Sequence, residues 1–250
     1  GQGVALVGGR DKQGLIPVFA VYDSFLQRGY DMLVQEMALE KLHVVLAVDR
    51  CGIVGADGET HHGCLDYLSQ IPGMTVLAPA SFAELRQMLR RAVLEMNGPV
   101  AVRYPRGGED GYEGDCGDES VTVLRQGTDA AIVTYGILTQ QALRAAALLA
   151  GESVSARVVK LNRVAPLDSD GICRALDGVK RIVAAEDQLR AGAVGERLSA
   201  LLLEQGAGTE KLVLRSVGTT LPSQGSTVEL RHALGLDAEG IVQAVREVLA

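Results

Sequence analysis

The segment His43-Val-Val-Leu-Ala-Val-Asp-Arg-Cys-Gly-Ile-Val-Gly-Ala-Asp-Gly-Glu-Thr-His-His-Gly63 decides how this chain is interpreted. Its first seven residues form an apolar, β-branched run of strand length, and a glycine-rich polar loop over residues 50–64 follows directly. We expect the strand to belong to a parallel sheet. The loop then lies beyond the carboxyl end of that strand, which is where ligands bind in α/β proteins.

Apolar strand patterns alternate with helical patterns on both sides of this segment. The expected strands are 17–22, 43–49, 74–78, 100–104, 130–135, 156–161, 181–185 and 211–217. The expected helices are 25–40 and 82–96, capped by Ser24 and Ser81, and then 139–149, 168–176, 194–205, 227–233 and 238–249. Strands separated by helices imply βαβ crossovers. The predicted fold class is therefore α/β, with two parallel-sheet domains.

A glycine-rich and acidic stretch interrupts the alternation. Five glycines and six acidic residues fall within residues 107–119, and only 121–124 resembles a short strand. We therefore expect a domain over 1–106, a linker over 107–127 and a second domain over 128–250. Such a polar stretch buries little apolar surface, so we expect 107–119 to be exposed and mobile and to pack on neither core.

Composition excludes several classes of protein. The chain has 250 residues, of which 47% are hydrophobic, as in folded globular domains. No apolar run reaches the roughly 18–20 residues of a membrane span. The formal net charge of −7 argues against a nucleic-acid partner. The four cysteines include no C-x-x-C pair and no signal peptide is recognised, which favours reduced thiols and a cytoplasmic location.

The 50–64 loop concentrates the polar side chains that could carry chemistry. It holds Arg50, Asp57, Glu59, His61 and His62. Adjacent histidines with acids and an arginine at a strand end favour a functional site over a surface loop whose glycines only serve turns. Three of these side chains could also ligate a metal from alternate positions. They lack the helical i,i+4 spacing of common zinc motifs, so no metal site is predicted.

Other strand ends carry polar or aromatic groups as well. Arg106 follows a proline, where its guanidinium could bind phosphate or carboxylate. An interdomain salt bridge is an equally good interpretation of the same arginine. Phe25, in the first turn of an expected helix, has the pattern of a core residue. In the second half, Glu186 and Asp187 end a strand without any nucleophile–base pattern.

Longer motifs resemble a known family. They are Val21-Tyr-Asp-Ser-Phe-Leu-Gln-Arg-Gly-Tyr-Asp31, the loop segment 49–63, Val102-Arg-Tyr-Pro-Arg-Gly107, and the shorter segments 223–225 and 229–237. Together they resemble the 1-deoxy-D-xylulose-5-phosphate synthases, which are thiamine-diphosphate-dependent transferases of the transketolase class. The resemblance covers the whole chain. It implies a pyrimidine-binding domain, truncated at its N-terminus, followed by a transketolase C-terminal domain.

The resemblance also implies a reaction. Members condense pyruvate with glyceraldehyde 3-phosphate and release carbon dioxide, which feeds isoprenoid, thiamine and pyridoxal biosynthesis. They use thiamine diphosphate and Mg²⁺ and form cytoplasmic homodimers. Phe25 would stack on the cofactor's aminopyrimidine, which replaces the core interpretation, and His61 and Asp57 would be catalytic, orienting pyruvate-derived groups. The substrate-binding residues would be Tyr22, Arg28, Arg50 and Arg106.

The family's diphosphate- and Mg²⁺-binding domain, and a glutamate that acts on the aminopyrimidine, would precede Gly1 in the same or a separate chain. We therefore expect this chain alone to be inactive. Residues 1–11 are richer in glycine than the family's helix, and the segment after His62 is two residues shorter. Two alternatives stay open: the C-terminal subunit of a split transketolase-like enzyme, and a non-catalytic scaffold of the same fold.

Overall fold

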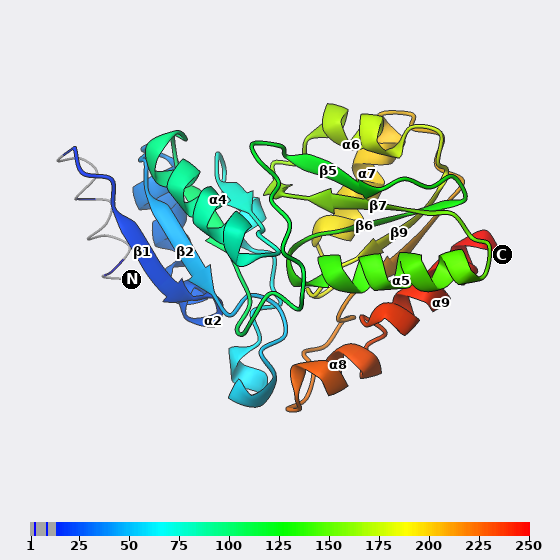
Figure 1. Ribbon diagram of the computed structural model, residues 1–250. Coiled ribbons are helices and arrows are strands. Elements are labelled where there is room, and N and C mark those ends of the chain that lie inside the picture. The colour runs from blue at the N-terminus through cyan, green and yellow to red at the C-terminus, as the bar shows by residue number, and fades with distance from the viewer. Residues whose placement is uncertain (1–2, 4–8, 10–13) are drawn as a thin grey trace.

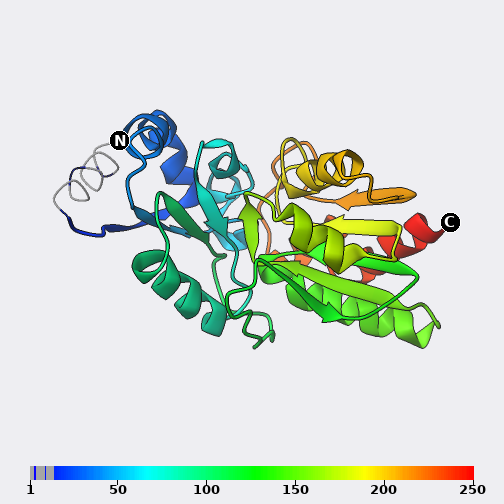
Figure 2. The same ribbon diagram turned by 90° about the horizontal axis from the view of Figure 1, so that it is seen from above.

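Two α/β domains lie side by side in the computed structural model of the protein (Figure 1), which describes residues 3, 9 and 14–250. Most of the glycine-rich segment 1–11 thus lies outside the described residues. Seen from above, the first domain lies at one end of the molecule and the red C-terminal helix at the other (Figure 2). Among the described residues, each domain has a mostly parallel five-stranded sheet. The predicted fold class is confirmed. No helix in the described part is long and apolar enough to cross a bilayer.

The first sheet has the order β1-β2-β4-β3-β8. Its strands are β1 (Val18–Tyr22), β2 (Val45–Asp49), β4 (Val100–Arg103), β3 (Thr75–Leu77) and β8 (Arg163–Ala165). The first four run parallel, and β8 pairs antiparallel with β3. Helix α4 (Phe82–Leu94) covers one face. As expected, its cap is Ser81, whose Oγ accepts a hydrogen bond from the Glu84 amide.

The other face carries broken helical turns where one continuous helix was expected. They are α2 (Asp23–Leu26), the 3₁₀ turn η1 (Gln27–Gly29), α3 (Tyr30–Met32) and the π-helical turn η2 (Leu33–Ala38). The expected Ser24 cap is wrong, because the helix begins at Asp23, two residues earlier than expected, and the Ser24 hydroxyl is buried without a hydrogen-bond partner. Gly29 adopts a non-helical conformation between two segments, which explains the break. Apolar side chains on both sides of this break still face the core, since Leu26, Leu33 and Met37 are buried.

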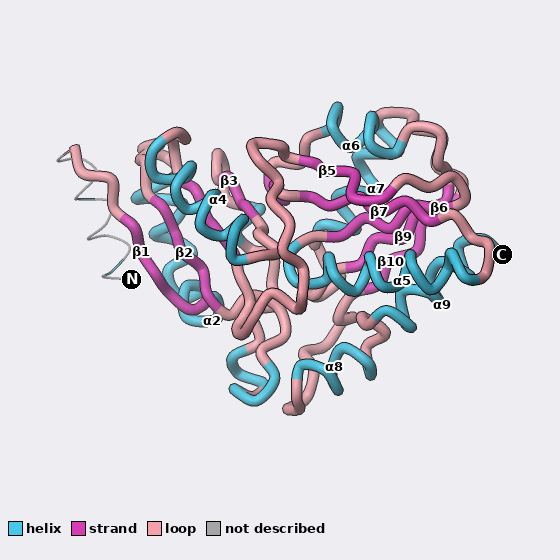
Figure 3. The backbone as a smooth tube through the Cα atoms, in the orientation of Figure 1, coloured by secondary structure: helices cyan, strands magenta, loops and turns pink. Residues whose placement is uncertain are grey.

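The second sheet has the order β10-β9-β6-β7-β5. Its strands are β10 (Lys211–Arg215), β9 (Arg181–Ala185), β6 (Ala130–Thr134), β7 (Ala156–Leu161) and the antiparallel edge strand β5 (Val121–Arg125). Figure 3 shows α5 (Thr139–Gly151) and α9 (Ala238–Leu249) together on one side of these strands and α6 (Ser169–Leu176) on the other. Helices α7 (Val194–Glu204) and α8 (Thr227–Ala233) complete the domain.

The chain passes from the second sheet to the first through a single residue. Asn162 alone separates β7 from β8, and it is buried. Its Nδ2 donates to the Glu119 carbonyl at 2.9 Å and to Thr122 Oγ1 at 2.8 Å, and its own carbonyl accepts from the Ala78 amide at 2.9 Å. The second half of the chain thereby completes the sheet of the first half.

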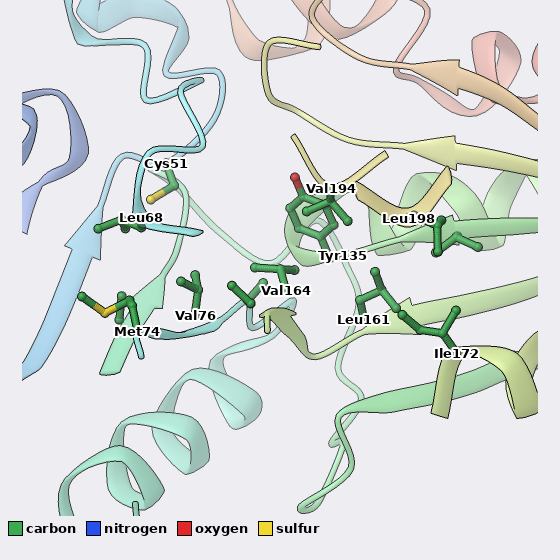
Figure 4. Packing of buried hydrophobic residues seen from close by; sticks show 14 of the residues in the cluster. Cys51, Leu68, Met74, Val76, Tyr135, Leu161, Val164, Ile172, Val194 and Leu198 are labelled. Atoms are coloured by element: carbon green, nitrogen blue, oxygen red, sulfur yellow. The ribbon is translucent and has the colours of Figure 1, made fainter. Parts of the chain in front are cut away.

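The two domains also share a hydrophobic core. One cluster of buried side chains contains residues of both sheets. In Figure 4, Val164 of β8 lies between Val76 on the first-domain side and Leu161 on the second-domain side. Because all three are at most 1% exposed, the boundary between the domains is a packed interior and not a solvated hinge.

The acidic segment 107–119 packs against this framework, so the expectation that it joins neither core is wrong, although most of its residues are exposed as expected. Tyr112 and Cys116 are buried, and Cys116 packs with Met88 of α4 and Val102 of β4. Ser81 Oγ donates a hydrogen bond of 2.6 Å to the Gly114 carbonyl. Two hydrophobic side chains and the backbone therefore anchor a segment whose composition indicated a free linker.

The acids of this segment have partners of their own, which is why they do not keep it extended. Glu109 accepts a hydrogen bond from the Phe82 amide at the start of α4, at 2.7 Å. Asp110 accepts from Gln141 Nε2 of α5 at 2.5 Å. Asp118 forms an ion pair with Arg91 at 2.9 Å. The sequence shows the acids but not these partners, which lie 27 or more residues away along the chain.

A fully buried ion pair joins the two domains. Lys160 Nζ of β7 lies 2.8 Å from Glu84 Oε2 of α4, and both side chains are 0% exposed. The same carboxylate accepts from the Ala80 amide at 2.8 Å, and the ammonium also donates to Asn162 Oδ1. These hydrogen bonds compensate the desolvation of both charges, so the pair holds only while both partners are present.

We predict that Lys160→Met lowers the free energy of unfolding by about 3–5 kcal/mol, because it leaves the Glu84 carboxylate buried without its cation. Urea denaturation followed by circular dichroism measures the loss. The matched control is Lys180→Met, which removes a cation of the exposed Lys180–Glu210 pair (3.4 Å, side chains 60% and 50% exposed). We expect this control to change stability by less than about 0.5 kcal/mol. Equal effects of the two substitutions would contradict the role given to the buried pair.

Candidate active site

The candidate site forms where three neighbouring parallel strands end. Tyr22 ends β1 and pairs in register with Asp49, which ends β2, and Arg103 ends β4 beside β2. Parallel neighbours bring their carboxyl ends to the same edge of the sheet. The loops that follow these strands therefore carry the predicted residues to one place.

The 50–64 loop is closed at its base by two glycines. The Gly52 amide donates to the Gly63 carbonyl at 2.7 Å, and the Gly63 amide donates to the Gly52 carbonyl at 3.0 Å. Above this closure the loop turns through two 3₁₀ segments, η3 (Gly55–Asp57) and η4 (Glu59–His61). Arg50 and Asp57 thereby lie close together although seven residues separate them.

Two arginines share one carboxylate. Arg50 Nε lies 2.9 Å from Asp57 Oδ2, and Arg106 Nη1 lies 2.5 Å from Asp57 Oδ1. The Arg50 guanidinium also lies over the Tyr22 ring, 3.7 Å from its centroid, and contacts Asp49 Oδ2 at 2.5 Å. Burial tends to lower the pKa of Arg50, but the hydrogen bond that Arg50 donates to Asp57 and the charge of Asp49 raise it overall, which secures its positive charge.

Phe25 lies on the surface of this site and not in the core. Its side chain is 47% exposed, so the interpretation from its pattern alone was wrong. Its ring stacks on Tyr22, with centroids 5.3 Å apart and planes 23° apart, and His61 meets it edge-on at 5.6 Å. An exposed, held aromatic ring is suited to stacking against a second planar group.

The two adjacent histidines have different roles. His62 is buried, and its Nδ1 accepts a hydrogen bond from the Val54 amide at 3.2 Å, inside the loop. Burial lowers the pKa of His62 despite opposing contributions from the backbone of Ser223 and Pro222 and from Glu59, so it is a neutral structural group. His61 is partly exposed beside Phe25, and its Nδ1 lies 3.1 Å from Thr60 Oγ1. Only His61 is therefore open to a ligand.

The structure brings together six of the seven predicted residues. They are Tyr22, Phe25, Arg50, Asp57, His61 and Arg106. Arg28 is exposed in η1, and within the described part of the chain no hydrogen bond or ion pair connects it to this group. No three His, Cys, Asp or Glu side chains among the described residues are placed to hold a metal ion.

Sequence reasoning left open whether Arg106 forms an interdomain salt bridge. Arg106 pairs with Asp57 of its own domain, and it is Arg103 that crosses to the second domain. Arg103 is buried at the end of β4, with Nη2 3.5 Å from Asp187 Oδ1. The sequence identified Asp187 only as an acidic residue at a strand end. Nothing in it indicated that Asp187 pairs with Arg103.

A pocket of about 340 Å³ adjoins the arginines. Arg50 and Arg106 line it together with two acidic residues, Asp49 and Glu109. Phe82, Leu85 and Ile137 contribute apolar surface. Ile137 belongs to η6 (Gly136–Leu138) of the second domain, so both domains line the pocket. Nothing in the sequence indicated this contribution, because η6 carries no motif and lies far along the chain.

Comparison with known proteins agrees with this architecture. Residues 3–108 match the model of the transketolase pyrimidine-binding domain, and residues 119–241 match the model of the transketolase C-terminal domain. The chain is similar to a split-gene transketolase described as an inactive β4 tetramer, with a TM-score of 0.87 and 27% identity. That alignment covers 99% of this chain and 81% of the other.

Curated relatives carry a more specific name. A 1-deoxy-D-xylulose-5-phosphate synthase of Chlorobium luteolum is 38% identical over 260 residues, covering 99% of this chain and 40% of the relative. One of Dechloromonas aromatica is 40% identical over 250 residues, covering 97% of this chain and 39% of the relative. The chain thus spans about 40% of the length of these relatives.

We predict that Asp57→Asn tightens the binding of sulfate, a dianion whose charge does not change near neutral pH. Asp57 occupies both guanidiniums, so removing its charge frees them for an external anion. An exposed ion pair is worth up to about 1 kcal/mol, which corresponds to roughly a fivefold gain in affinity. Isothermal titration measures it. Glu59→Gln, an exposed acid on the same loop, is the control and should leave sulfate affinity unchanged. Unchanged affinity of Asp57→Asn would contradict the prediction.

Proposed function

This chain belongs to the transketolase family, and we propose that it is the pyrimidine-binding and C-terminal part of a 1-deoxy-D-xylulose-5-phosphate synthase. The family resemblance that the motifs indicated is confirmed by the two matching domain models. The proposed reaction condenses pyruvate with glyceraldehyde 3-phosphate and releases carbon dioxide. The main support from the structure is the pair of arginines held by Asp57 next to an exposed aromatic stack.

The arginines would bind the phosphate of the aldehyde. Arg50 and Arg106 come from two different strand ends and converge on one carboxylate, so their guanidiniums lie close enough to share one anion. The phosphate dianion would replace Asp57 at Arg106, whose side chain is 45% exposed. Tyr22 would stay under the Arg50 guanidinium and keep its plane in place.

The aromatic surface fits a planar heterocycle. Phe25, stacked on Tyr22 and open to solvent, would hold the aminopyrimidine of thiamine diphosphate. When bound, this cofactor supplies the electron sink that decarboxylation of pyruvate requires. By the family resemblance, Mg²⁺ and the diphosphate would be held by an N-terminal domain in the same or a separate chain, and no three His, Cys, Asp or Glu side chains of the described residues are placed to hold a metal ion. We therefore propose that this chain alone is inactive.

His61 and Asp57 would act on the reacting groups. His61 touches the Phe25 ring edge-on, so its imidazole would lie beside whatever stacks there, and an imidazole can exchange protons near neutral pH. Once phosphate has taken one arginine from it, Asp57 would remain as an acceptor for a substrate hydroxyl. Arg28 stays a substrate-binding candidate on the resemblance alone.

The C-terminal subunit of a split transketolase-like enzyme is the second candidate. It is supported by the similarity to the split-gene transketolase over 99% of this chain. The two candidates differ in the donor substrate. Pyruvate with release of carbon dioxide indicates the synthase, whereas transfer from a ketose phosphate without carbon dioxide indicates a transketolase. A non-catalytic scaffold would do neither. A homodimer is part of the proposal for either enzyme.

We predict that Arg106→Ala, in the enzyme that contains this chain and its cofactor-binding domain, raises KM for glyceraldehyde 3-phosphate by roughly 10- to 150-fold. One charge-assisted contact to phosphate contributes about 1.5–3 kcal/mol. KM for pyruvate should stay nearly unchanged. Steady-state kinetics with each substrate varied in turn measures both values.

The control for this variant is Arg86→Ala, which removes an exposed arginine of α4 outside the pocket lining. It should leave both KM values as they are. Equal increases for the two substrates in Arg106→Ala would show that Arg106 supports the structure of the site and does not bind the phosphate.

A further inference from the structure

A buried aspartate lies directly beneath the candidate site. Asp23 is the first residue of α2, one residue after Tyr22 and two before Phe25, and it is 2% exposed. Tyr67 donates its hydroxyl to Asp23 Oδ1 at 2.8 Å and to the Asp23 carbonyl at 3.1 Å. No role in the proposed chemistry uses this carboxyl, although it adjoins the residues that do.

The Asp23 carboxyl packs against the base of the 50–64 loop. A Cβ atom added at Gly63 would lie 2.5 Å from Asp23 Oδ2 and 2.4 Å from the Arg50 carbonyl oxygen. This carboxyl therefore fills the space that a side chain at Gly63 would need. Gly63 is one of the two residues whose paired hydrogen bonds close the loop.

A second carboxylate packs on the same closure from the other domain. A Cβ atom added at Gly52 would lie 1.8 Å from Asp187 Oδ2, so Asp187 fills the space beside Gly52. Asp187 has a cation, since Arg103 lies 3.5 Å away. Asp23 has the neutral Tyr67 hydroxyl as its hydrogen-bond donor instead.

The surroundings of Asp23 favour its protonated form. Burial is the main cause that raises its pKa to about 7, and the charges of Asp66 and Asp187 raise it further. The Tyr67 hydrogen bond and the Arg103 charge act in the opposite direction. Two buried thiols, Cys51 and Cys64, also interact electrostatically with Asp23, and burial raises the pKa of each.

We propose that Asp23 is a positioning residue whose buried carboxyl holds the closed base of the 50–64 loop, and through it Arg50, Asp57 and His61. Arg50 lies over the Tyr22 ring, and His61 meets the Phe25 ring edge-on. The Gly52–Gly63 closure joins the two ends of the loop segment that carries Asp57 and His61, so their placement depends on this closure and on the carboxyls packed against it. The benefit to substrate binding rests on the proposed function, but the loop closure does not.

The proposal gives a specific pH dependence. When the base of the loop opens, Asp23 meets water and its pKa returns toward the ordinary value of 3.8. The closed form binds the proton more tightly, so closure is favoured at low pH and weakens as the pH rises toward about 7. Above that pH both forms are ionised and the closure free energy becomes constant.

Hydrogen exchange of the Gly52 and Gly63 amides tests this. After correction for the pH dependence of the intrinsic exchange rate, we expect the protection factors of the two amides in the unmodified chain to fall as the pH rises. The fall should be up to about tenfold per pH unit, and it should level off above about pH 7. In Asp23→Asn, which keeps the shape and an acceptor for Tyr67, protection should not depend on pH. Persistence of the fall in Asp23→Asn would overturn the proposal.

Two further variants make the test specific. Tyr67→Phe removes a hydrogen bond that lowers the pKa of Asp23, so the plateau should begin at a higher pH; a plateau at the same or a lower pH overturns the proposal.

Glu186→Gln is the matched control, because burial also raises the pKa of Glu186 to about 7. Its carboxylate accepts from Tyr135 and from the Val194 and Gly195 amides, and not from the loop. This control should keep the full pH dependence, and its loss would overturn the proposal. No substrate is involved, so the result stands apart from the proposed function.

Discussion

The crossing at Asn162 constrains the whole molecule. One residue between β7 and β8 leaves no slack, so a strand that leaves the second sheet must enter the first. The buried amide of Asn162 bonds to residues before and inside β5, and its carbonyl bonds to the segment after β3. The Lys160–Glu84 ion pair lies next to this crossing and joins β7 to α4. Relative motion of the domains would break all of these buried interactions together.

This rigidity is what allows two domains to build one site. The arginines and the aromatic stack lie at the end of the first sheet, while the pocket beside them is completed by Ile137 of the second domain. The base of the 50–64 loop likewise carries Asp23 on one side and Asp187, from the second domain, on the other. A flexible hinge between the domains would leave Gly52 without its packing partner. The acidic segment 107–119 also ties the domains together, because it is attached to α4, to α5 and to the core between α4 and the first sheet.

Much of this fold could be predicted from sequence because its central strands, such as β2, β4 and β6, are buried along nearly their whole length. Runs such as 43–49 and 130–135 contain few polar residues, so their strand pattern is clear. Ser81 can be recognised as a helix cap from the residues next to it. Strand β8 could not be predicted, since three residues hold no periodicity. The segment 107–119 was misjudged because its composition shows six acids but not their distant partners. The site followed from the motifs, whereas the contact between Asp187 and Gly52 depends on how two domains pack, which no local pattern encodes.

The two glycines at the loop base divide the 50–64 loop into parts of very different mutational tolerance. Gly52 and Gly63 have no room for any side chain, because carboxylates already occupy that volume. At the tip, Ala56, Glu59 and Thr60 are exposed to solvent, close to Asp57 and His61 in the chain. Laboratory evolution of ligand preference at the candidate site could therefore draw its diversity from these three positions, and the scaffold beneath them would remain the same in every member of the library.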